Sequence, residues 1–463
     1  MERLGKSISF GWWLPLLMLL ALGLHWRALP FSFFSDDFSV IHKLGVRQDL
    51  SPGTFFRPLP DWTLWLQFRL HGPEAWVFRL VNVLLLGLNG WLVALLARKL
   101  IRAEAAMLAG VLFVLYPFHL EPQMWIIGRS TAMATLFVLL ALNAAARDAE
   151  PWRKAIGVLA LGSMGALCYE SALLLPMMLA AWFIILRPVD ARGWGLATAA
   201  SAIAVALHLL VRASVINRIA NEYGTGFFDK PLSNYLGMIA KVIGRSFLPP
   251  HEEPSVQTVR FALLFVVLAI VGIWFWRTRK SEPQIRRFAL LFVALFGIAS
   301  IIAIVGGVST RTSESDRFLY LPSAFMCMLV AMCLDGMRSK VLARGLIAVV
   351  ALSWIMLLRN SMGNWRIASE TITRIISETP DPPSNGRLLV INLPGDYKGA
   401  YIFRHGFREA QMLRGWIHEN VVVIRDPTDV RWRADRMDVA GARQTDLVFD
   451  AASLLPRSAE NGE

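Results

Sequence analysis

Long apolar runs recur along the chain, and they constrain its fold more than any other feature. Runs of roughly 20 residues alternate with short charged segments, and a helix of about 20 apolar residues spans the hydrocarbon layer of a bilayer. Only helices and closed barrels satisfy all their backbone hydrogen bonds inside lipid. Hydrophobic residues make up 55% of the 463 residues and charged residues 17%, which excludes an ordinary soluble chain. The sequence therefore predicts an all-α polytopic membrane protein.

Hydropathy and helix-breaking residues together indicate about eleven spans. They lie near residues 8–29, 79–97, 105–118, 130–146, 155–169, 171–186, 193–211, 260–276, 288–308, 319–335 and 343–359. Arginine and lysine cluster in the connections at residues 98–102, 147–154 and 277–287, which the positive-inside rule assigns to the cytoplasm. We therefore expect the amino terminus inside. The net charge of +13 follows from this bias, so it does not indicate a nucleic-acid partner.

The apolar stretch of residues 155–186 contains Glu170 near its centre. A charge at the middle of a bilayer costs at least about 2.5 kcal/mol, so we divide the stretch at Tyr169, Glu170 and Ser171 and expect Glu170 at the outer surface. One tilted span is the alternative. It would move every later loop to the opposite side and place the cationic loop at residues 277–287 outside, which argues for the division.

Hydropathy also suggests the domain organisation. Residues 1–359 are expected to form the membrane domain, with outer loops at 30–78 and 212–259, the first containing an aromatic interfacial helix. Polar residues increase after residue 360, and strand-like segments at 386–394 and 419–426 flank a helix-like segment at 400–416. This pattern predicts a small extracytoplasmic α/β domain over residues 360–455, followed by a disordered tail at 456–463.

Under this topology, the unusual ionisable and polar residues gather on the outer face, close to the ends of spans. They are Asp36, Asp37, Arg57, His119, Glu121, Arg129, Glu170, Arg317 and Tyr320. Charges at the membrane interface are costly when buried, so a cluster of both signs predicts a functional site. Transfer of a sugar from a polyprenyl phosphate needs such a cluster. A carboxylate takes the proton of the acceptor hydroxyl, and arginines stabilise the departing phosphate through their planar fork.

Each of these residues also has a structural explanation. Two aspartates after a serine can cap a helix or start a turn, and Arg57 can pair with Glu74. His119 can fill a hydrogen-bonded packing position, and Arg129 can extend to the interface. The functional interpretation therefore depends on their joint placement.

Four motifs, in order and spacing, resemble the membrane region of TMTC-type O-mannosyltransferases and their bacterial relatives in the GT-C superfamily. The motifs are SDDFSVI, the segment from FFRPLP to ALLARKL, YPFHLEPQMWIIGRSTAMATLFVLLAL and DRFLYLPSAF, and they cover roughly residues 30–190 and 310–335. The resemblance implies a GT-C-like fold, a polyprenyl-phosphate sugar as co-substrate, and an outer-loop aspartate as base, at Asp36 or Asp37.

The resemblance and the outer placement together suggest roles for the remaining candidates. We assign Glu121 to catalysis with the two aspartates. We assign the donor phosphate site to Arg57, His119, Arg129, Glu170, Arg317 and Tyr320. A divalent cation, if one takes part, would be held by Asp36 and Asp37.

The chain departs from that family after residue 360, because residues 360–463 show no 34-residue tetratricopeptide repeat. The acceptor can therefore be a glycan, a lipid or a protein, and mannose does not carry over as the sugar. We expect a multi-pass protein of the bacterial cytoplasmic membrane, surrounded by membrane lipids, with its active site facing outward. A transporter or flippase, or an enzyme that joins or polymerises finished glycans, are the alternatives.

Overall fold

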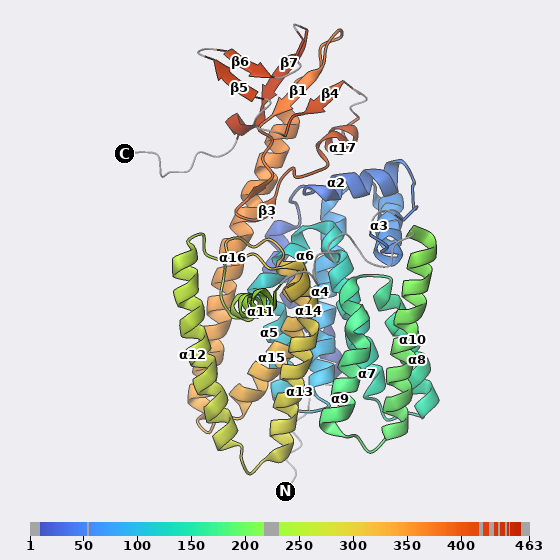
Figure 1. Cartoon of the computed structure of the whole chain (residues 1–463), viewed down its shortest axis with the longest axis vertical. Coiled ribbons are helices and arrows are strands. Elements are labelled where there is room, and N and C mark those ends of the chain that lie inside the picture. Colours follow the sequence, from blue (N-terminus) through green and yellow to red (C-terminus); the bar gives the residue numbers. More distant parts are fainter. Residues whose placement is uncertain are drawn as a thin grey trace.

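A bundle of long helices forms most of the molecule, and a small sheet region stands on one end of it (Figure 1). The computed structural model describes residues 10–52, 55–216, 231–415, 420–425, 430–433, 436–439, 442–443 and 445–454. Seven of the described helices are long and apolar enough to cross a membrane, or up to eight if the bent pair Ala103–Leu115 and Pro117–Met124 is one span. The predicted class, an all-α polytopic membrane protein with a small carboxy-terminal α/β region, is confirmed.

Every predicted span overlaps a helix. The helices of the bundle are α1 (Trp13–His25), α4 (Ala75–Ala97), α5 (Ala103–Leu115), α7 (Arg129–Ala145), α8 (Pro151–Ala166), α9 (Leu175–Leu186), α10 (Ala191–Ile216), α12 (Pro254–Thr278), α13 (Pro283–Ala299), α14 (Ile301–Gly306), α15 (Tyr320–Asp335) and α16 (Lys340–Glu378). Several of them are shorter than a typical span, and the number of membrane crossings stays a prediction.

The break expected near Glu170 is present. Helix α8 ends at Ala166, Tyr169 is extended, and a 3-10 helix over Glu170–Leu174 leads into α9. Residues 155–186 therefore form two helices separated at the predicted position.

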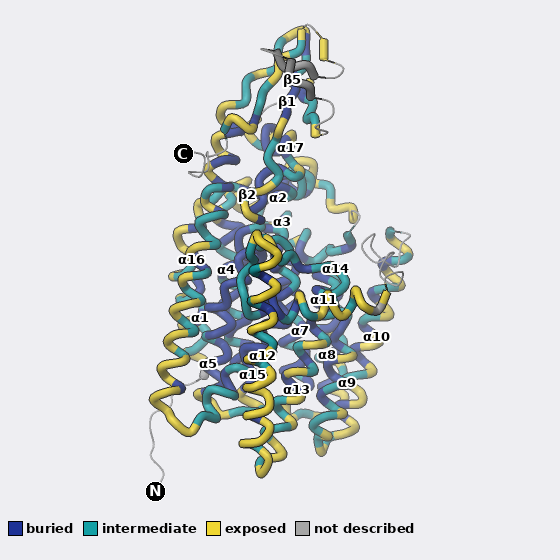
Figure 2. Tube along the Cα trace, turned by 60° about the vertical axis from the view of Figure 1, so that its left-hand side comes forward, coloured by how far each residue is buried: buried dark blue, intermediate teal, exposed yellow. Residues whose placement is uncertain are grey.

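The inner and outer helices of the bundle differ in what they bury. The apolar windows of Ile126–Ala145 and Asp316–Asp335 are 78% and 72% buried, whereas those of α12 and α16 are only 11% buried. Many residues along α12 and α16 are accordingly exposed (Figure 2). Inside the bundle, α4 and α5 lie close together at Gly90 and Gly110. A Cβ atom on Gly110 would lie only 2.6 Å from the Gly90 carbonyl oxygen, so the close approach requires glycine there. Apolar side chains that face outward on α12 and α16 suit contact with lipid tails.

Short helices fill the end of the bundle that carries the sheet. These are α2 (Asp36–Ile41), a π-helical turn at His42–Val46, α3 (Pro58–His71), a 3-10 turn at Pro117–His119, α6 (Leu120–Met124), a 3-10 turn at Ile126–Gly128, α11 (Leu232–Phe247) and a 3-10 turn at Asp316–Leu319. Helix α3 is the helix expected in the loop 30–78, with Trp62 exposed and Leu64 buried. Most candidate site residues lie on these short elements.

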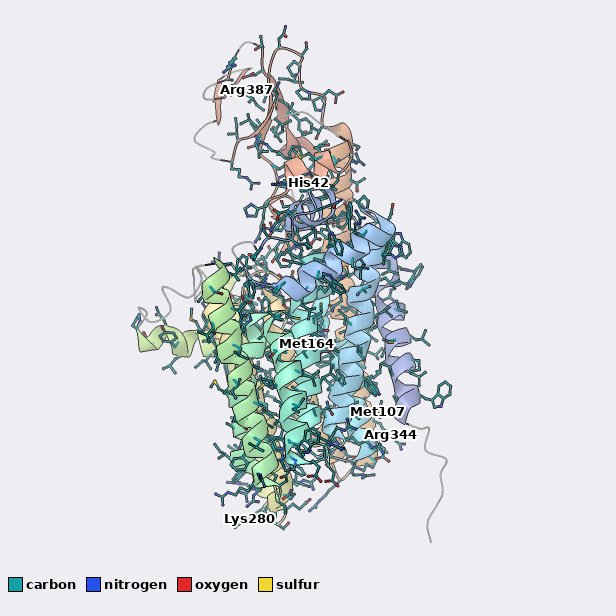
Figure 3. The ribbon with its side chains drawn as sticks, turned by 90° about the vertical axis from the view of Figure 1, so that its right-hand side faces the viewer. His42, Met107, Met164, Lys280, Arg344 and Arg387 are labelled. Atoms are coloured by element: carbon teal, nitrogen blue, oxygen red, sulfur yellow. The ribbon has the colours of Figure 1, made fainter. Side chains whose placement is uncertain are left out.

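Helix α16 joins the bundle to the sheet region as one continuous helix that ends at Glu378. The predicted span end at residue 359 therefore lies inside a helix, because the polar residues after Arg359 continue the helix beyond the apolar segment. Figure 3 shows Lys280 and Arg387 at opposite ends of the molecule. The division into two domains at residue 360 stays a prediction.

The carboxy-terminal region contains a three-stranded parallel sheet. Strand β1 (Leu388–Ile391) lies between β4 (Val421–Val423) and β7 (Leu447–Asp450), with Leu388 opposite both Val421 and Leu447. Both predicted strand segments are confirmed by β1 and β4.

The helix expected over residues 400–416 is shorter in the structure. Strands β2 (Asp396–Tyr397) and β3 (Ala400–Tyr401) form a hairpin, and α17 covers only Phe407–Met412. Strands β5 (Val430–Arg433) and β6 (Arg436–Val439) form a second antiparallel pair, and a 3-10 turn covers Ala451–Leu454. The predicted disordered tail at 456–463 lies outside the described residues.

Candidate active site

The two adjacent aspartates at the start of α2 have different environments. Asp37 is fully buried and accepts three backbone hydrogen bonds, from Phe34 and Ile126 at one oxygen and from Ile127 at the other, each 3.1 Å long. Burial raises the pKa of the Asp37 carboxyl to about 7, while the three N–H groups and Arg79 act to lower it. Asp37 therefore fastens α2 to the turn before α7, and its oxygens face protein backbone.

Asp36 is only partly buried, since neighbouring residues on a helix point about 100° apart. Burial raises the pKa of the Asp36 carboxyl, and the positive side chains of His405, Arg317 and Arg404 act in the opposite direction. The carboxylate of Asp36 thus lies within electrostatic reach of the cationic cluster.

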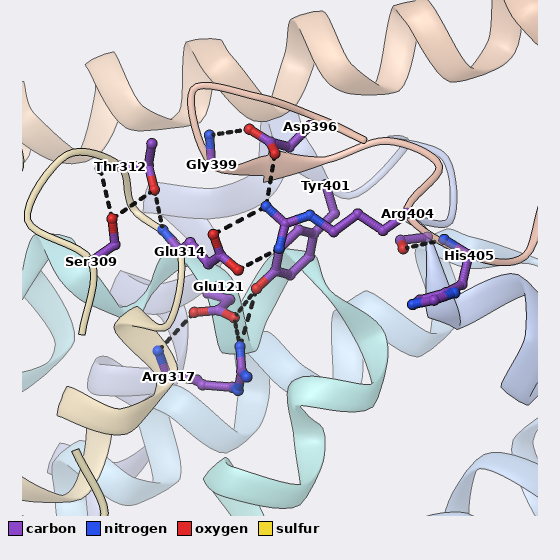
Figure 4. Close-up of polar contacts among 11 residues, drawn as sticks. Glu121, Ser309, Thr312, Glu314, Arg317, Asp396, Gly399, Tyr401, Arg404 and His405 are labelled. Atoms are coloured by element: carbon purple, nitrogen blue, oxygen red, sulfur yellow. Dashed lines mark hydrogen bonds and ion pairs between the residues drawn. The ribbon is translucent and has the colours of Figure 1, made fainter. Parts of the chain in front are cut away.

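Glu121 and Arg317 form the centre of that cluster (Figure 4). Glu121 is 2% exposed; one of its oxygens accepts hydrogen bonds from the Arg317 guanidinium and, at 2.7 Å, from the Tyr401 hydroxyl. The other oxygen accepts from the Arg317 backbone N–H at 2.9 Å. The Arg317 guanidinium also lies 5.1 Å from the centre of the Trp125 ring, and 21% of its side chain stays exposed. Arg317 is therefore fixed in orientation while part of it remains accessible.

The acidic neighbours of Arg317 in sequence have other partners. Asp316 is buried and pairs with Arg245 of α11. Glu314 pairs with Arg404, which also donates to Asp396 at 2.7 Å. An ion pair between Arg317 and either of these neighbours is therefore not the arrangement in the structure.

A second cationic group lies around Arg57. Its guanidinium donates to Glu170 at 2.9 Å, with the two side chains 23% and 21% exposed, and not to Glu74. It also lies 4.3 Å from the centre of the Tyr169 ring. Both Arg57 and Arg317 act electrostatically on the Tyr169 hydroxyl, so this tyrosine is within reach of both arginines.

Helix α10 adds two residues that the sequence analysis did not select, His208 and Arg212. Arg212 is 3% exposed and lies within electrostatic reach of Glu170 and Arg57. Its Nε and Nη2 atoms, like Nδ1 of His208, are buried without a hydrogen-bond partner among the described residues. The spacing of four between polar residues in an apolar run places them on one helix face, and this signal could have identified them.

Three predicted donor-binding residues lie inside the bundle instead. His119 is fully buried, 2.7 Å from the Ser323 hydroxyl, and its ring is 4.3 Å from that of Tyr320. Tyr320 is also buried and accepts from Asn89 at 3.2 Å. Arg129 donates to Asn82 and to the Phe78 carbonyl, both at 2.9 Å. These contacts favour packing roles, and donor binding by the three residues stays a prediction.

Sequence comparison finds relatives among protein mannosyltransferases. A family model described as Dolichyl-phosphate-mannose-protein mannosyltransferase matches residues 52–216. Protein O-mannosyl-transferase Tmtc1 of Drosophila melanogaster is 31% identical over 121 residues, which is 26% of this chain and 14% of that protein. A protein O-mannosyl-transferase of Caenorhabditis elegans is 21% identical over 300 residues, 60% of this chain and 42% of the relative. The chain thus matches less than half the length of each.

Solved structures share the fold over most of the chain. ArnT from Cupriavidus metallidurans, solved bound to undecaprenyl phosphate, aligns with a TM-score of 0.53 and 14% identity over 88% of both chains. The archaeal oligosaccharyltransferase AglB from Archaeoglobus fulgidus, in complex with an inhibitory peptide and a dolichol-phosphate, aligns with a TM-score of 0.51 and 12% identity, covering 88% of this chain and 65% of AglB. In fold and in part of its sequence the chain is therefore similar to glycosyltransferases of the GT-C superfamily. The predicted resemblance is therefore confirmed at the level of the superfamily.

The carboxy-terminal region of the chain contributes to the candidate site. Tyr401, Arg404 and His405 all face Asp36 or Glu121, and none of them was predicted. They come from a segment that begins 280 residues after Glu121, so local sequence patterns contain no signal for the contact.

Carboxylates near the site do not form an evident metal centre. Within the described ranges, no group of three or more His, Cys, Asp or Glu residues is arranged to hold a metal ion. The oxygens of Asp37 already accept three backbone N–H groups. A divalent cation at Asp36 and Asp37 stays a prediction.

Proposed function

We propose that this protein transfers a sugar from a polyprenyl-phosphate-linked donor to an acceptor hydroxyl, at the end of the bundle that carries the sheet region and on the extracytoplasmic side. The observation that carries the proposal is the placement of a partly buried carboxylate, Asp36, within electrostatic reach of the fixed and partly exposed cation Arg317. Similarity to glycosyltransferases of the GT-C superfamily supports glycosyl transfer, and ArnT and AglB were solved with polyprenyl phosphates bound.

Asp36 acts as the base in this reaction. It takes the proton of the acceptor hydroxyl as the acceptor oxygen forms a bond to the anomeric carbon of the sugar. The bond between that carbon and the phosphate oxygen breaks, and its electron pair leaves with the lipid phosphate. Arg317 and Arg57 stabilise the charge of this phosphate by hydrogen bonds that Glu121 and Glu170 orient. One displacement inverts the configuration at the anomeric carbon.

The distribution of buried charge supports transfer over transport. The buried charged side chains around the site are Asp37, Arg79, Glu121, Arg129, Arg212, Arg245 and Asp316. They lie on the short elements beneath the sheet region or within five residues of an end of α4, α7 or α10, except Arg245 on α11, whereas a transport path requires polar groups through the midplane. Lys154, which pairs with Asp190 at 2.5 Å, is the other exception among the described residues.

Product analysis tests the proposal directly. Purified protein in lipid nanodiscs is incubated with a panel of radiolabelled polyprenyl-phosphate sugars and an extract of envelope glycans, lipids and proteins. We expect one donor to lose its label to an acceptor, with inverted configuration by NMR. Translocation of intact donor across proteoliposomes without transfer would instead support the flippase alternative, and transfer of a preassembled glycan would support a ligase.

Arg317→Lys tests the phosphate role. Lysine keeps a positive charge beside the buried Glu121 but replaces a planar fork with a point charge. Loss of one charged hydrogen bond costs roughly 1.5 to 3 kcal/mol, so kcat/KM for the donor should fall about 10-fold to 150-fold. Arg387→Lys is the control, because Arg387 pairs with Asp446 in the sheet region and has no proposed contact with the donor or with Asp36. Equal kinetics of the two variants would remove Arg317 from the phosphate site.

A further inference from the structure

The turn that precedes Asp36 is in an unfavourable backbone conformation. Ser35 has φ 45° and ψ −115°, a positive φ that residues with a side chain rarely adopt. Ser35 is 2% exposed, and its backbone conformation determines where the α2 helix begins. Contacts elsewhere must therefore stabilise this turn, since a serine does not favour it intrinsically.

Those contacts come from residues 402–407, which we call the clasp. The Ser35 backbone N–H donates to the Ile402 carbonyl at 2.9 Å, and the His405 backbone N–H donates to the Ser35 hydroxyl at 3.2 Å. Figure 4 shows the second bond beside the Glu121 and Arg317 network. The clasp thus binds both sides of one strained residue that lies about 370 positions earlier in the chain.

The shape of the clasp depends on Gly406. This glycine has φ 82°, and a Cβ there would lie 2.5 Å from the Ser35 carbonyl oxygen and 3.1 Å from the Phe38 Cβ. The Phe403 ring stacks on the Phe38 ring, with centres 5.7 Å apart and planes inclined by 26°. The clasp therefore packs against α2 at a distance that only glycine permits.

The residue before the clasp connects it to the other half of the site. The Tyr401 hydroxyl donates to Glu121 at 2.7 Å and lies 3.1 Å from the Arg317 guanidinium. One short segment therefore contacts both the turn of the proposed base and the pair that includes the proposed phosphate ligand.

We propose that the clasp is a positioning element of the active site: Gly406 and Phe403 hold the strained Ser35 turn, and so hold Asp36 in place facing Arg317. The carboxy-terminal region is then part of the catalytic machinery. The expected effect on turnover rests on the proposed function. The stabilisation of the Ser35 turn by the clasp does not.

Two glycine variants distinguish the loss of the clasp contacts from a general loss of folding stability. Gly406→Ala introduces a Cβ against the Ser35 carbonyl, whereas Gly415→Ala is the matched control, with φ 90° and no atom of the described residues within 4 Å of its Cβ. Full-length protein in nanodiscs is compared by hydrogen exchange of the amides of residues 35–41 and by transfer rate. We expect exchange at least 10-fold faster and kcat about 10-fold lower for Gly406→Ala, with donor KM unchanged, and neither change for Gly415→Ala. Phe403→Leu, which removes the ring stack on Phe38, provides a second route if Gly406→Ala does not fold.

Ser35→Gly tests the role of strain, because glycine adopts the positive φ without penalty. In the Ser35→Gly background, Gly406→Ala should lower kcat no more than about 3-fold. An equal loss in both backgrounds, or faster exchange with unchanged kcat, would overturn the positioning role. Unchanged exchange in residues 35–41 would overturn the clasp itself. Absence of transfer by the wild-type protein would contradict the proposed function, while the exchange comparison would still test the clasp.

Discussion

Residues with the same chemistry differ in role here because of what surrounds them. Asp36 and Asp37 are adjacent carboxylates, yet Asp37 accepts three backbone N–H groups while Asp36 faces cations. The same holds for Arg129, which binds Asn82 and a carbonyl inside the bundle, and Arg317, which stays partly exposed. Residue type alone is therefore a weak guide to function at this site.

Substitution of each aspartate by asparagine should separate their roles. Asp36→Asn removes the proposed base at constant volume, so we expect turnover to fall at least 100-fold with thermal stability unchanged. Asp37→Asn places an amide N–H₂ among N–H donors, which costs about 1–3 kcal/mol for each unsatisfied group, so we expect a lower unfolding temperature. Transfer assays and thermal unfolding in detergent measure both. Wild-type turnover of Asp36→Asn would exclude it as the base.

The pH dependence of turnover should report the neighbours of Asp36. Burial raises the pKa of Asp36, and His405, Arg317 and Arg404 act to lower it. Removing one of these cations by His405→Gln should therefore raise this pKa further. Because the base works only when ionised, the acidic limb of the kcat/KM profile should move to higher pH. A limb that stays in place would show that His405 does not act on the base.

Breaks and continuations of helices decide which residues reach the site. The break after Ala166 places Tyr169 and Glu170 beside Arg57. His208 and Arg212 share one face of α10, and Arg212 is a buried cation within electrostatic reach of Glu170. Helix α16 acts through continuity and not through a break. It continues without interruption to Glu378 and so carries the sheet region over α2.

Arg212→Met tests the contribution of α10. Methionine keeps most of the side-chain length, and the Nε and Nη2 atoms it removes have no hydrogen-bond partner in the described part of the chain, so we expect no loss of stability. If Arg212 assists Arg57 at the donor phosphate, donor KM should rise about 10-fold or more. Arg192→Met, an exposed arginine near the other end of α10, should leave KM unchanged. An equal KM for both variants would assign Arg212 a purely structural position.

At the scale of the molecule, cationic loops and candidate site lie at opposite ends. Lys280 is at the end far from the sheet region, and Arg387 is in that region (Figure 3). This separation is what the positive-inside rule requires if the site faces outward.

Cysteine labelling in intact cells tests that orientation. A single cysteine at the exposed Lys280 position should react only after the membrane is permeabilised, and one at the exposed Lys398 position should react with an impermeant reagent from outside. Serine replaces the native residues Cys168, Cys327 and Cys333 in both proteins. Labelling of position 280 from outside would invert the topology and place the candidate site in the cytoplasm.

The sequence by itself determined the membrane class, the positions of the apolar helices and the break at Glu170, because transfer of side chains into lipid is a local property of each segment. Motif order was also sufficient for the resemblance to GT-C glycosyltransferases. Only the tertiary structure decided which aspartate is accessible, that Arg317 pairs with Glu121 and not with Glu314 or Asp316, and that residues 401–406 complete the site. These outcomes depend on contacts between residues hundreds of positions apart. Hydrophobicity and spacing contain no information on such contacts, since they arise from the packing of helices against one another and against the sheet region.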